Sequence, residues 1–252
     1  MLIDTHCHIH EEGYPLDVDH VIHRAHEADV MQMLCVGTSQ ESSRRAVTFA
    51  AEREGLFSVI GVHPHEAKDG WEEIRALVGA ENIVAVGEIG LDYFYTHSSR
   101  EVQVKALEGQ IDFALRHDLP IVFHVREAFD DFWPIFDNFS GIRGELHSFT
   151  DTARQLEEAL KRGLFIGVNG ISTFTKEEHQ KAMFTSVPLD KLLLETDAPF
   201  LTPIPFRGKV NEPAFVRNVA EHHATIRGIS LDEVATATSM NASALFALSN
   251  KQ

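Results

Sequence analysis

Four histidines and two carboxylates stand at or just after the ends of short apolar segments, and their side chains are of the types that bind metal ions. They are His6, His8, Glu88, His124, His147 and Asp197. These residues are spread over most of the sequence, so one site requires a fold that gathers distant segments. A barrel of parallel strands does this, because its active-site residues lie at the carboxyl ends of the strands.

The immediate neighbours of His6, His8 and Glu88 indicate what these three residues could bind. His6 and His8 are two residues apart in an apolar segment, so their imidazoles would share one face of a strand and could chelate one ion. This pattern alone is a weak signal in a chain with 15 histidines. Glu88 follows another apolar segment, where a metal ion is the simplest partner for a buried carboxylate. A salt bridge to Arg126 is the alternative, and it suits Asp92 better than Glu88.

The number of candidate ligands predicts more than one ion. Six ligands exceed the coordination of one tetrahedral ion and suit two divalent ions that share a carboxylate. Paired ions can activate water and stabilise both the attacking and the leaving oxygen of a phosphodiester. Two divalent cations outweigh two carboxylates in charge, so we expect a positive pocket that accepts an anionic substrate.

Further polar residues are expected around the mouth of this pocket, and we predict that they bind substrate. They are His63, His65, Arg126 and Arg207. An ordinary loop containing two histidines is the alternative for His63 and His65. Arg207 is equally suited to contact a phosphate or to hold its own loop.

Eight apolar segments of strand length recur along the chain, with amphipathic segments between them. The predicted strands cover residues 2–9, 31–38, 56–63, 83–92, 119–125, 143–149, 163–170 and 191–197. The predicted helices cover residues 18–29, 41–54, 71–78, 100–116, 128–136, 152–162, 176–185, 213–226, 231–238 and 242–248. This alternation predicts an α/β fold, a (β/α)8 TIM barrel with extra C-terminal helices. An open doubly wound sheet is the alternative, but a histidine pair stands where its glycine-rich phosphate loop would follow the first strand.

Composition limits the class of protein. The length of 252 residues, with 44% hydrophobic residues, fits one domain over residues 1–252. No apolar run approaches the roughly 20 residues that span a membrane, and the N-terminus does not resemble a signal peptide. Cys7 and Cys35 lie inside predicted strands and are expected to be reduced, which predicts a cytoplasmic protein. The net charge of −16 argues against a protein that coats duplex nucleic acid, and we expect a monomer.

Several motifs together resemble those of a known family, and they extend over nearly the whole chain. They are residues 4–8 (DTHCH), 61–65 (GVHPH), 87–93 (GEIGLDY), 124–128 (HVREA), 147–149 (HSF), 193–203 (LLETDAPFLTP), 207–209 (RGK) and 211–213 (NEP). The sequence resembles the TatD-type metal-dependent hydrolases of the amidohydrolase superfamily, usually described as deoxyribonucleases. It departs from the family pattern at His10, at Val210 and over residues 148–151, and no metal ligand is lost.

The resemblance implies a division of the ligands between two divalent ions, which could be Mg²⁺, Mn²⁺ or Zn²⁺. One ion would be bound by His6, His8, Glu88 and Asp197, and the other by Glu88, His124 and His147. Asp197 and Glu88 would be the catalytic residues, with Asp197 also orienting or deprotonating the attacking water.

The resemblance also implies a reaction. The expected activity is that of a deoxyribonuclease, 3′-5′ exonuclease-like on single-stranded or frayed DNA, with DNA or RNA bound only transiently. A metal-dependent ester or amide hydrolase, such as an aminoacyl-tRNA deacylase, is the first alternative. A non-catalytic binding protein on the same barrel is the second, and the complete ligand set argues against it.

Overall fold

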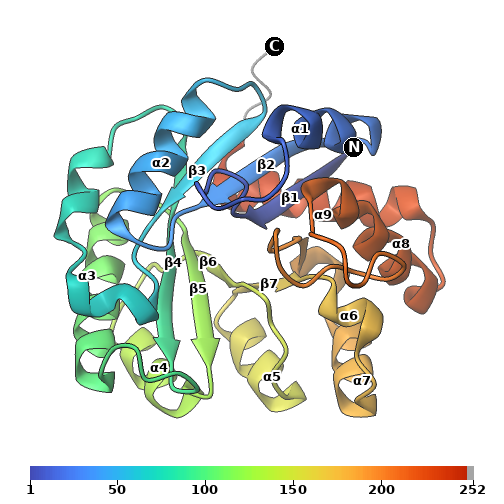
Figure 1. Cartoon of the computed structure of the whole chain (residues 1–252). Helices are drawn as coiled ribbons and strands as arrows, with labels where there is room; N and C mark the ends of the chain where they lie inside the picture. Colours follow the sequence, from blue (N-terminus) through green and yellow to red (C-terminus); the bar gives the residue numbers. More distant parts are fainter. Residues whose placement is uncertain (249–252) are drawn as a thin grey trace. The chain divides into compact units, whose positions relative to one another are not determined.

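The computed structural model describes residues 1–248, in which eight strands alternate with helices (Figure 1). The strands are β1 (Leu2–Cys7), β2 (Val30–Val36), β3 (Leu56–Ile60), β4 (Ile83–Asp92), β5 (Ile121–Arg126), β6 (Gly144–Leu146), β7 (Phe165–Val168) and β8 (Leu192–Leu194). They belong to one sheet in which each strand neighbours the next in the sequence. Neighbouring strands pair in parallel, as in β3–β4, β4–β5 and β7–β8. All eight predicted strands are therefore present.

Helices follow most of the strands. The α-helices are α1 (Val18–Glu27), α2 (Gln40–Ala51), α3 (Arg100–Arg116), α4 (Phe129–Phe136), α5 (Ala153–Lys161), α6 (Ile171–Phe174), α7 (Glu178–Ser186), α8 (Val216–Arg227) and α9 (Leu231–Phe246). The 3-10 helices are η1 (Pro64–Asp69), η2 (Glu72–Leu77), η3 (Leu189–Lys191) and η4 (Pro213–Phe215). Within residues 1–248, no helix is long and apolar enough to cross a membrane.

The contacts group the chain into two compact units, which we describe separately. The first contains Met1–Leu34 and the residues from His147 onward. Its first and last strands lie side by side, since the amide of Asp197 donates to the carbonyl of His6 at 2.8 Å and that of His8 to the carbonyl of Ala198 at 2.8 Å. Sequential strand order together with this junction of β1 and β8 makes the fold a (β/α)8 barrel, as predicted. Helix α9 packs on both β1 and β8 (Figure 1).

A buried side-chain clasp reinforces the junction of β1 and β8. Asp4 is fully buried, and its carboxylate accepts hydrogen bonds from the amide and the hydroxyl of Thr196 at 2.8 and 2.6 Å. Burial raises the pKa of Asp4 well above its usual value, although the bonds from Thr196 oppose the shift. The clasp therefore joins segments 192 residues apart without leaving this carboxylate unsatisfied.

Removing the hydroxyl of this clasp is expected to destabilise the fold. Thr196→Val is nearly isosteric but leaves one oxygen of buried Asp4 without its donor, which costs about 1–3 kcal/mol in the free energy of unfolding. Urea unfolding followed by circular dichroism measures the loss. Thr225→Val, at an exposed position on α8, is the matched control and should change stability by less than about 0.5 kcal/mol. Equal stability of the Thr196→Val variant and the wild type would contradict a stabilising clasp.

The second unit contains Cys35–Leu146. Helix α2 packs on β3, and α3 packs on β4 (Figure 1). Strands β4 and β5 are in register, with Gly90 opposite His124 and Asp92 opposite Arg126. A Cβ atom at Gly87 would lie 2.6 Å from Cβ of Val122, so glycine is required here for β4 to approach β5. Glu88 is the residue directly after this closely packed glycine.

The structure differs from the prediction mainly at the ends of elements. The strand predicted over 191–197 ends at Leu194, and Asp197 has a left-handed backbone with φ of 57°. The two helices predicted over 231–238 and 242–248 are one helix, α9, which ends at Phe246, because no glycine or proline interrupts it. The segment predicted as a helix over 71–78 is the 3-10 helix η2. One domain over 1–252 stays a prediction, and its last four residues lie outside the described residues.

Candidate metal centre

Three predicted ligands of the first unit form a compact group at the β1–β8 junction. One ligand atom from each of His6, His8 and Asp197 lies within 4.8 Å of the others. The Nε2 atoms of His6 and His8 are 3.3 Å apart, and Oδ1 of Asp197 is 3.2 Å from Nε2 of His8 and 3.8 Å from Nε2 of His6. His6 is fully buried, His8 is nearly so, and the side chain of Asp197 is 15% exposed. The group is thus enclosed but open to a small ligand at Asp197.

The backbone turns Asp197 toward the two histidines. Its left-handed φ is uncommon for a residue other than glycine and is tolerated best by Asn and Asp. Burial raises the pKa of the Asp197 carboxyl, but the hydrogen bond from His8 and the nearby imidazoles of His147 and His6 outweigh this and lower it. Asp197 is therefore ionised at neutral pH, as a metal ligand or a base must be.

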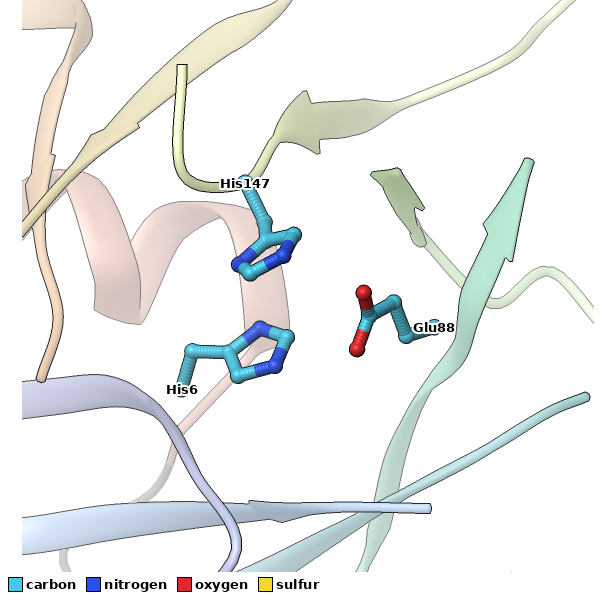
Figure 2. Close-up of side chains that lie close together, drawn as sticks. All are labelled: His6, Glu88 and His147. Atoms are coloured by element: carbon cyan, nitrogen blue, oxygen red, sulfur yellow. The ribbon is translucent and has the colours of Figure 1, made fainter. Parts of the chain in front are cut away.

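His147, the next predicted ligand in this unit, follows β6 and stacks on His6. Figure 2 shows the two rings face to face, with centroids 3.8 Å apart and an angle of 19° between their planes. Figure 2 also draws Glu88, which lies on β4 and belongs to the second unit. The first unit therefore brings together four of the six predicted ligands.

A buried glutamate lies behind His147. Oε1 of Glu195 is 3.4 Å from Nδ1 of His147 and accepts hydrogen bonds from the amide of Ser148 at 2.7 Å and from Nδ2 of Asn169 at 3.2 Å. A Cβ atom at Gly167 would collide with the carboxylate of Glu195, so a glycine makes room for it. A proton on Nδ1 of His147 would face this carboxylate and would leave Nε2 as the nitrogen suited to a metal.

Glu88 and His124 are paired in the second unit. Oε1 of Glu88, a residue only 4% exposed, lies 2.9 Å from Nδ1 of His124. The same oxygen lies 3.5 Å from Nε2 of His63. The second unit therefore presents a buried carboxylate among imidazoles, and a metal ion as the partner of Glu88 stays a prediction.

Asp92 lies on the other side of the His124 ring. Its Oδ2 is 3.0 Å from Nε2 of His124 and 3.1 Å from Nε2 of His65, and its Oδ1 accepts from the amides of Phe94 and Tyr95. Burial raises the pKa of Asp92, but the bonds from His124 and the backbone outweigh this and lower it below the usual range. An ionised Asp92 fixes the proton of His124 on Nε2 and leaves Nδ1, the nitrogen facing Glu88, for a metal. Asp92 is thus paired with imidazoles, whereas Arg126, the partner considered for it from the sequence, lies over the ring of Phe94.

His63 is a hydrogen-bond donor rather than a base. Its Nδ1 accepts from the amide of His65 at 3.1 Å, so the neutral ring carries its proton on Nε2. Burial and the neighbouring His124 lower the pKa of His63 well below its usual value, which keeps the ring neutral at pH 7. One ligand atom each from His63, Asp92 and His124 also lies within 4.8 Å of the others, so this part of the second unit has metal-binding chemistry of its own.

The two predicted arginines differ in their surroundings. The guanidinium of Arg126 lies 3.9 Å from the ring centre of Phe94, on the exposed side of β5. Arg207 donates to the carbonyl of Thr202 at 2.8 Å and lies 3.8 Å from the ring centre of Phe174. These contacts are the loop-holding ones that were predicted as an alternative for Arg207, and its contact with substrate stays a prediction.

Within each unit the donor set fits divalent metal ions. Imidazole and carboxylate are the common protein ligands of Zn²⁺ and Mn²⁺, and buried ionised carboxylates require a counter-charge. Comparison with known proteins agrees. The sequence profile of the family described as "TatD related DNase" matches residues 3–247. The chain belongs to the TatD family.

The TatD relatives cover the chain almost completely. The uncharacterized metal-dependent hydrolase YabD of Bacillus subtilis is 37% identical over 98% of this chain and 99% of its own length. The 3′-5′ ssDNA/RNA exonuclease TatD of Erwinia amylovora is 35% identical over 98% of this chain and 100% of its own. The crystal structure of the TatD homologue YjjV from Escherichia coli, 30% identical, matches with a TM-score of 0.91 over 98% of both chains. The protein is therefore a metal-dependent hydrolase with the barrel fold of this family.

Replacement of Asp92 by Asn should weaken metal binding in this TatD protein. The amide of Asn cannot match both of the Oδ2 contacts of Asp92, so His124 loses the acceptor that fixes its tautomer. Loss of such a partner typically lowers metal affinity about 10- to 100-fold. Isothermal titration of Asp92→Asn with Mn²⁺ or Zn²⁺ measures the change, with Asp190→Asn, at an exposed position, as the control. Unchanged affinity at every site would show that Asp92 does not act through His124.

Proposed function

We propose that two divalent ions share Glu88 in this protein. In the proposed arrangement His6, His8 and Asp197 complete the site of one ion, and His124 and His147 complete the site of the other. The ions, which we take to be Mg²⁺, Mn²⁺ or Zn²⁺, would activate a water molecule and neutralise charge on a phosphate when bound. The compact His6–His8–Asp197 group is the observation that carries this proposal, because it joins three of these ligands from opposite ends of the chain.

We further propose that the substrate is a nucleic acid, cleaved at phosphodiester bonds from the 3′ end of a single or frayed strand. Relatives named 3′-5′ ssDNA/RNA exonuclease cover the chain almost fully, which supports this substrate. The acidic protein has a net charge of −16, which disfavours broad electrostatic contact with a duplex and favours a site that takes a strand end. DNA is the first candidate, with RNA as a further one.

The residues of the chain have separate roles in this proposal. Asp197, ionised and partly exposed, orients the attacking water and accepts its proton. Neutral His63 offers the Nε2 proton to a phosphate oxygen or to Glu88. His65, Arg126 and Arg207 remain proposed substrate contacts around the site.

A panel of substrates tests the proposed function. We expect the metal-loaded protein to shorten a 5′-labelled single-stranded oligonucleotide stepwise, and to act more slowly on a blunt duplex of the same sequence. An RNA strand and an aminoacyl-tRNA are offered to the same preparation. Cleavage of the ester of aminoacyl-tRNA without any shortening of DNA or RNA would assign the site to deacylation and overturn the nuclease proposal.

The cellular setting is a further proposal. Cys7 and Cys35 are both buried and carry thiols rather than a disulfide, which fits a reducing compartment such as the cytoplasm. We also propose that the protein acts as a monomer, which size-exclusion chromatography with light scattering tests.

A further inference from the structure

The loop that follows β4 carries an aromatic surface that the proposed chemistry does not use. Phe94 is 49% exposed and Tyr95 is 43% exposed, and the two residues are adjacent. Their rings meet edge to face, with centroids 4.7 Å apart. Neighbouring exposed aromatic side chains are a feature of surfaces that bind ligands.

Arg126 adds a positive charge to this surface. Its guanidinium lies 3.9 Å from the ring centre of Phe94 and 5.2 Å from that of Tyr95. This contact covers part of Phe94 and fixes its orientation, while about half of the residue remains open to solvent. We call Phe94, Tyr95 and Arg126 the aromatic surface.

Hydrogen bonds to buried side chains hold the backbone of the loop at both of its ends. Asp92 accepts hydrogen bonds from the amides of both Phe94 and Tyr95. Buried Gln103, on α3, bonds the amide and the carbonyl of Asp92 and the carbonyl of Ser98, and so secures both ends of the loop. A ring held in place loses little conformational entropy when a ligand stacks on it.

The aromatic surface is continuous with the imidazoles of the second unit. The ring of Tyr95 is 5.3 Å from that of His65, at an angle of 87°. His65 and His124 both contact Oδ2 of Asp92, the residue that anchors the loop. One side chain therefore connects the exposed rings to the group around His124.

We propose that the aromatic surface is a base-stacking subsite for the single-stranded end of a nucleic acid, an inference that rests on the proposed nuclease activity. A base would stack on the open part of Phe94 and contact the neighbouring ring of Tyr95, and Arg126 would contact the adjoining phosphate. The net charge of −16 means that general electrostatic attraction to phosphates contributes little to binding. Stacking on an aromatic ring supplies affinity that does not depend on this charge. Because every base has a π-face, the subsite accepts any sequence.

The test measures binding and cleavage of one labelled oligonucleotide by Phe94→Ala and Tyr95→Ala. Stacking on an aromatic residue predicts that each variant raises Kd, from fluorescence anisotropy in chelator, and KM roughly 5- to 150-fold, with kcat little changed. Phe94→Leu, which keeps an apolar side chain without the ring, should also bind more weakly than wild type. Met240→Ala removes another exposed apolar side chain and is the control, with no change expected.

Substrates without bases decide whether stacking is the cause. When abasic sites replace each of the last three nucleotides in turn, the effect of Phe94→Ala should disappear at one of them. Equal binding by the wild type and both alanine variants, or full retention of binding in Phe94→Leu, would overturn the stacking subsite while leaving the nuclease intact. Absence of both cleavage and binding by the wild type would overturn the proposed function and the subsite together.

Discussion

Glu88→Gln should reduce the hydrolytic activity of the protein by about a thousandfold or more, because loss of metal-derived stabilisation worth several kcal/mol has an effect of that size. The amide keeps the shape of the side chain but removes the charge, and Glu88 is the carboxylate that both proposed ions would share. The measurement is kcat/KM on the single-stranded oligonucleotide at saturating Mn²⁺, together with metal content per chain.

Metal content makes this experiment specific. We expect wild type to bind two ions and Glu88→Gln to bind fewer. Glu108→Gln, at an exposed position on α3, is the matched control and should retain both activity and metal. Undiminished cleavage by the Glu88→Gln variant would refute the shared-carboxylate proposal.

Asp197→Asn should lower kcat by about 10²- to 10⁴-fold, the usual contribution of a positioned general base. The carboxyl is ionised because the hydrogen bond from His8 and the surrounding imidazoles more than offset its burial. Asn can still contact His8 but cannot accept a proton from water. We therefore expect kcat to fall far more than KM when the rate is measured at saturating metal.

The pH dependence of the rate separates a base from a mere ligand. Wild type should lose activity on the acid side as Asp197 gains a proton, at a pH below the usual range for Asp because its pKa is lowered. The residual activity of the Asp197→Asn variant should lack that acid limb. Asp190→Asn is the control, and a variant profile with the same acid limb as wild type would contradict the role of Asp197 as the base.

The sequence predicted the architecture well because the strands are apolar and the segments between them are amphipathic. The bounds of β4 and α3 were predicted to the residue. Errors fell where tertiary geometry overrides local pattern. The segment before Asp197 looks like a strand, yet the chain leaves the sheet after Leu194 to bring that side chain to His6 and His8.

The site was predicted less completely. Residue types and strand ends located the candidate ligands, and the first unit brings His6, His8, His147 and Asp197 together. The contacts of Glu195 with His147 and of Asp92 with His124 could not be derived from the sequence. Both depend on the register between neighbouring strands, which the sequence does not give. A signal existed for Glu195, because it stands two residues before Asp197 and residues two apart in a strand share a face. The only feature of the sequence that pointed to the aromatic surface is the run of three consecutive aromatic residues after β4.

The junction of β1 and β8 has a consequence for biosynthesis. The clasp between Asp4 and Thr196 spans 192 residues, a stretch that a ribosome needs roughly 10 to 40 s to translate. During that interval the nascent chain displays His6 and His8 without Asp197. On the proposed role of Asp197, we expect a truncated translation product that ends before this residue to lack hydrolytic activity.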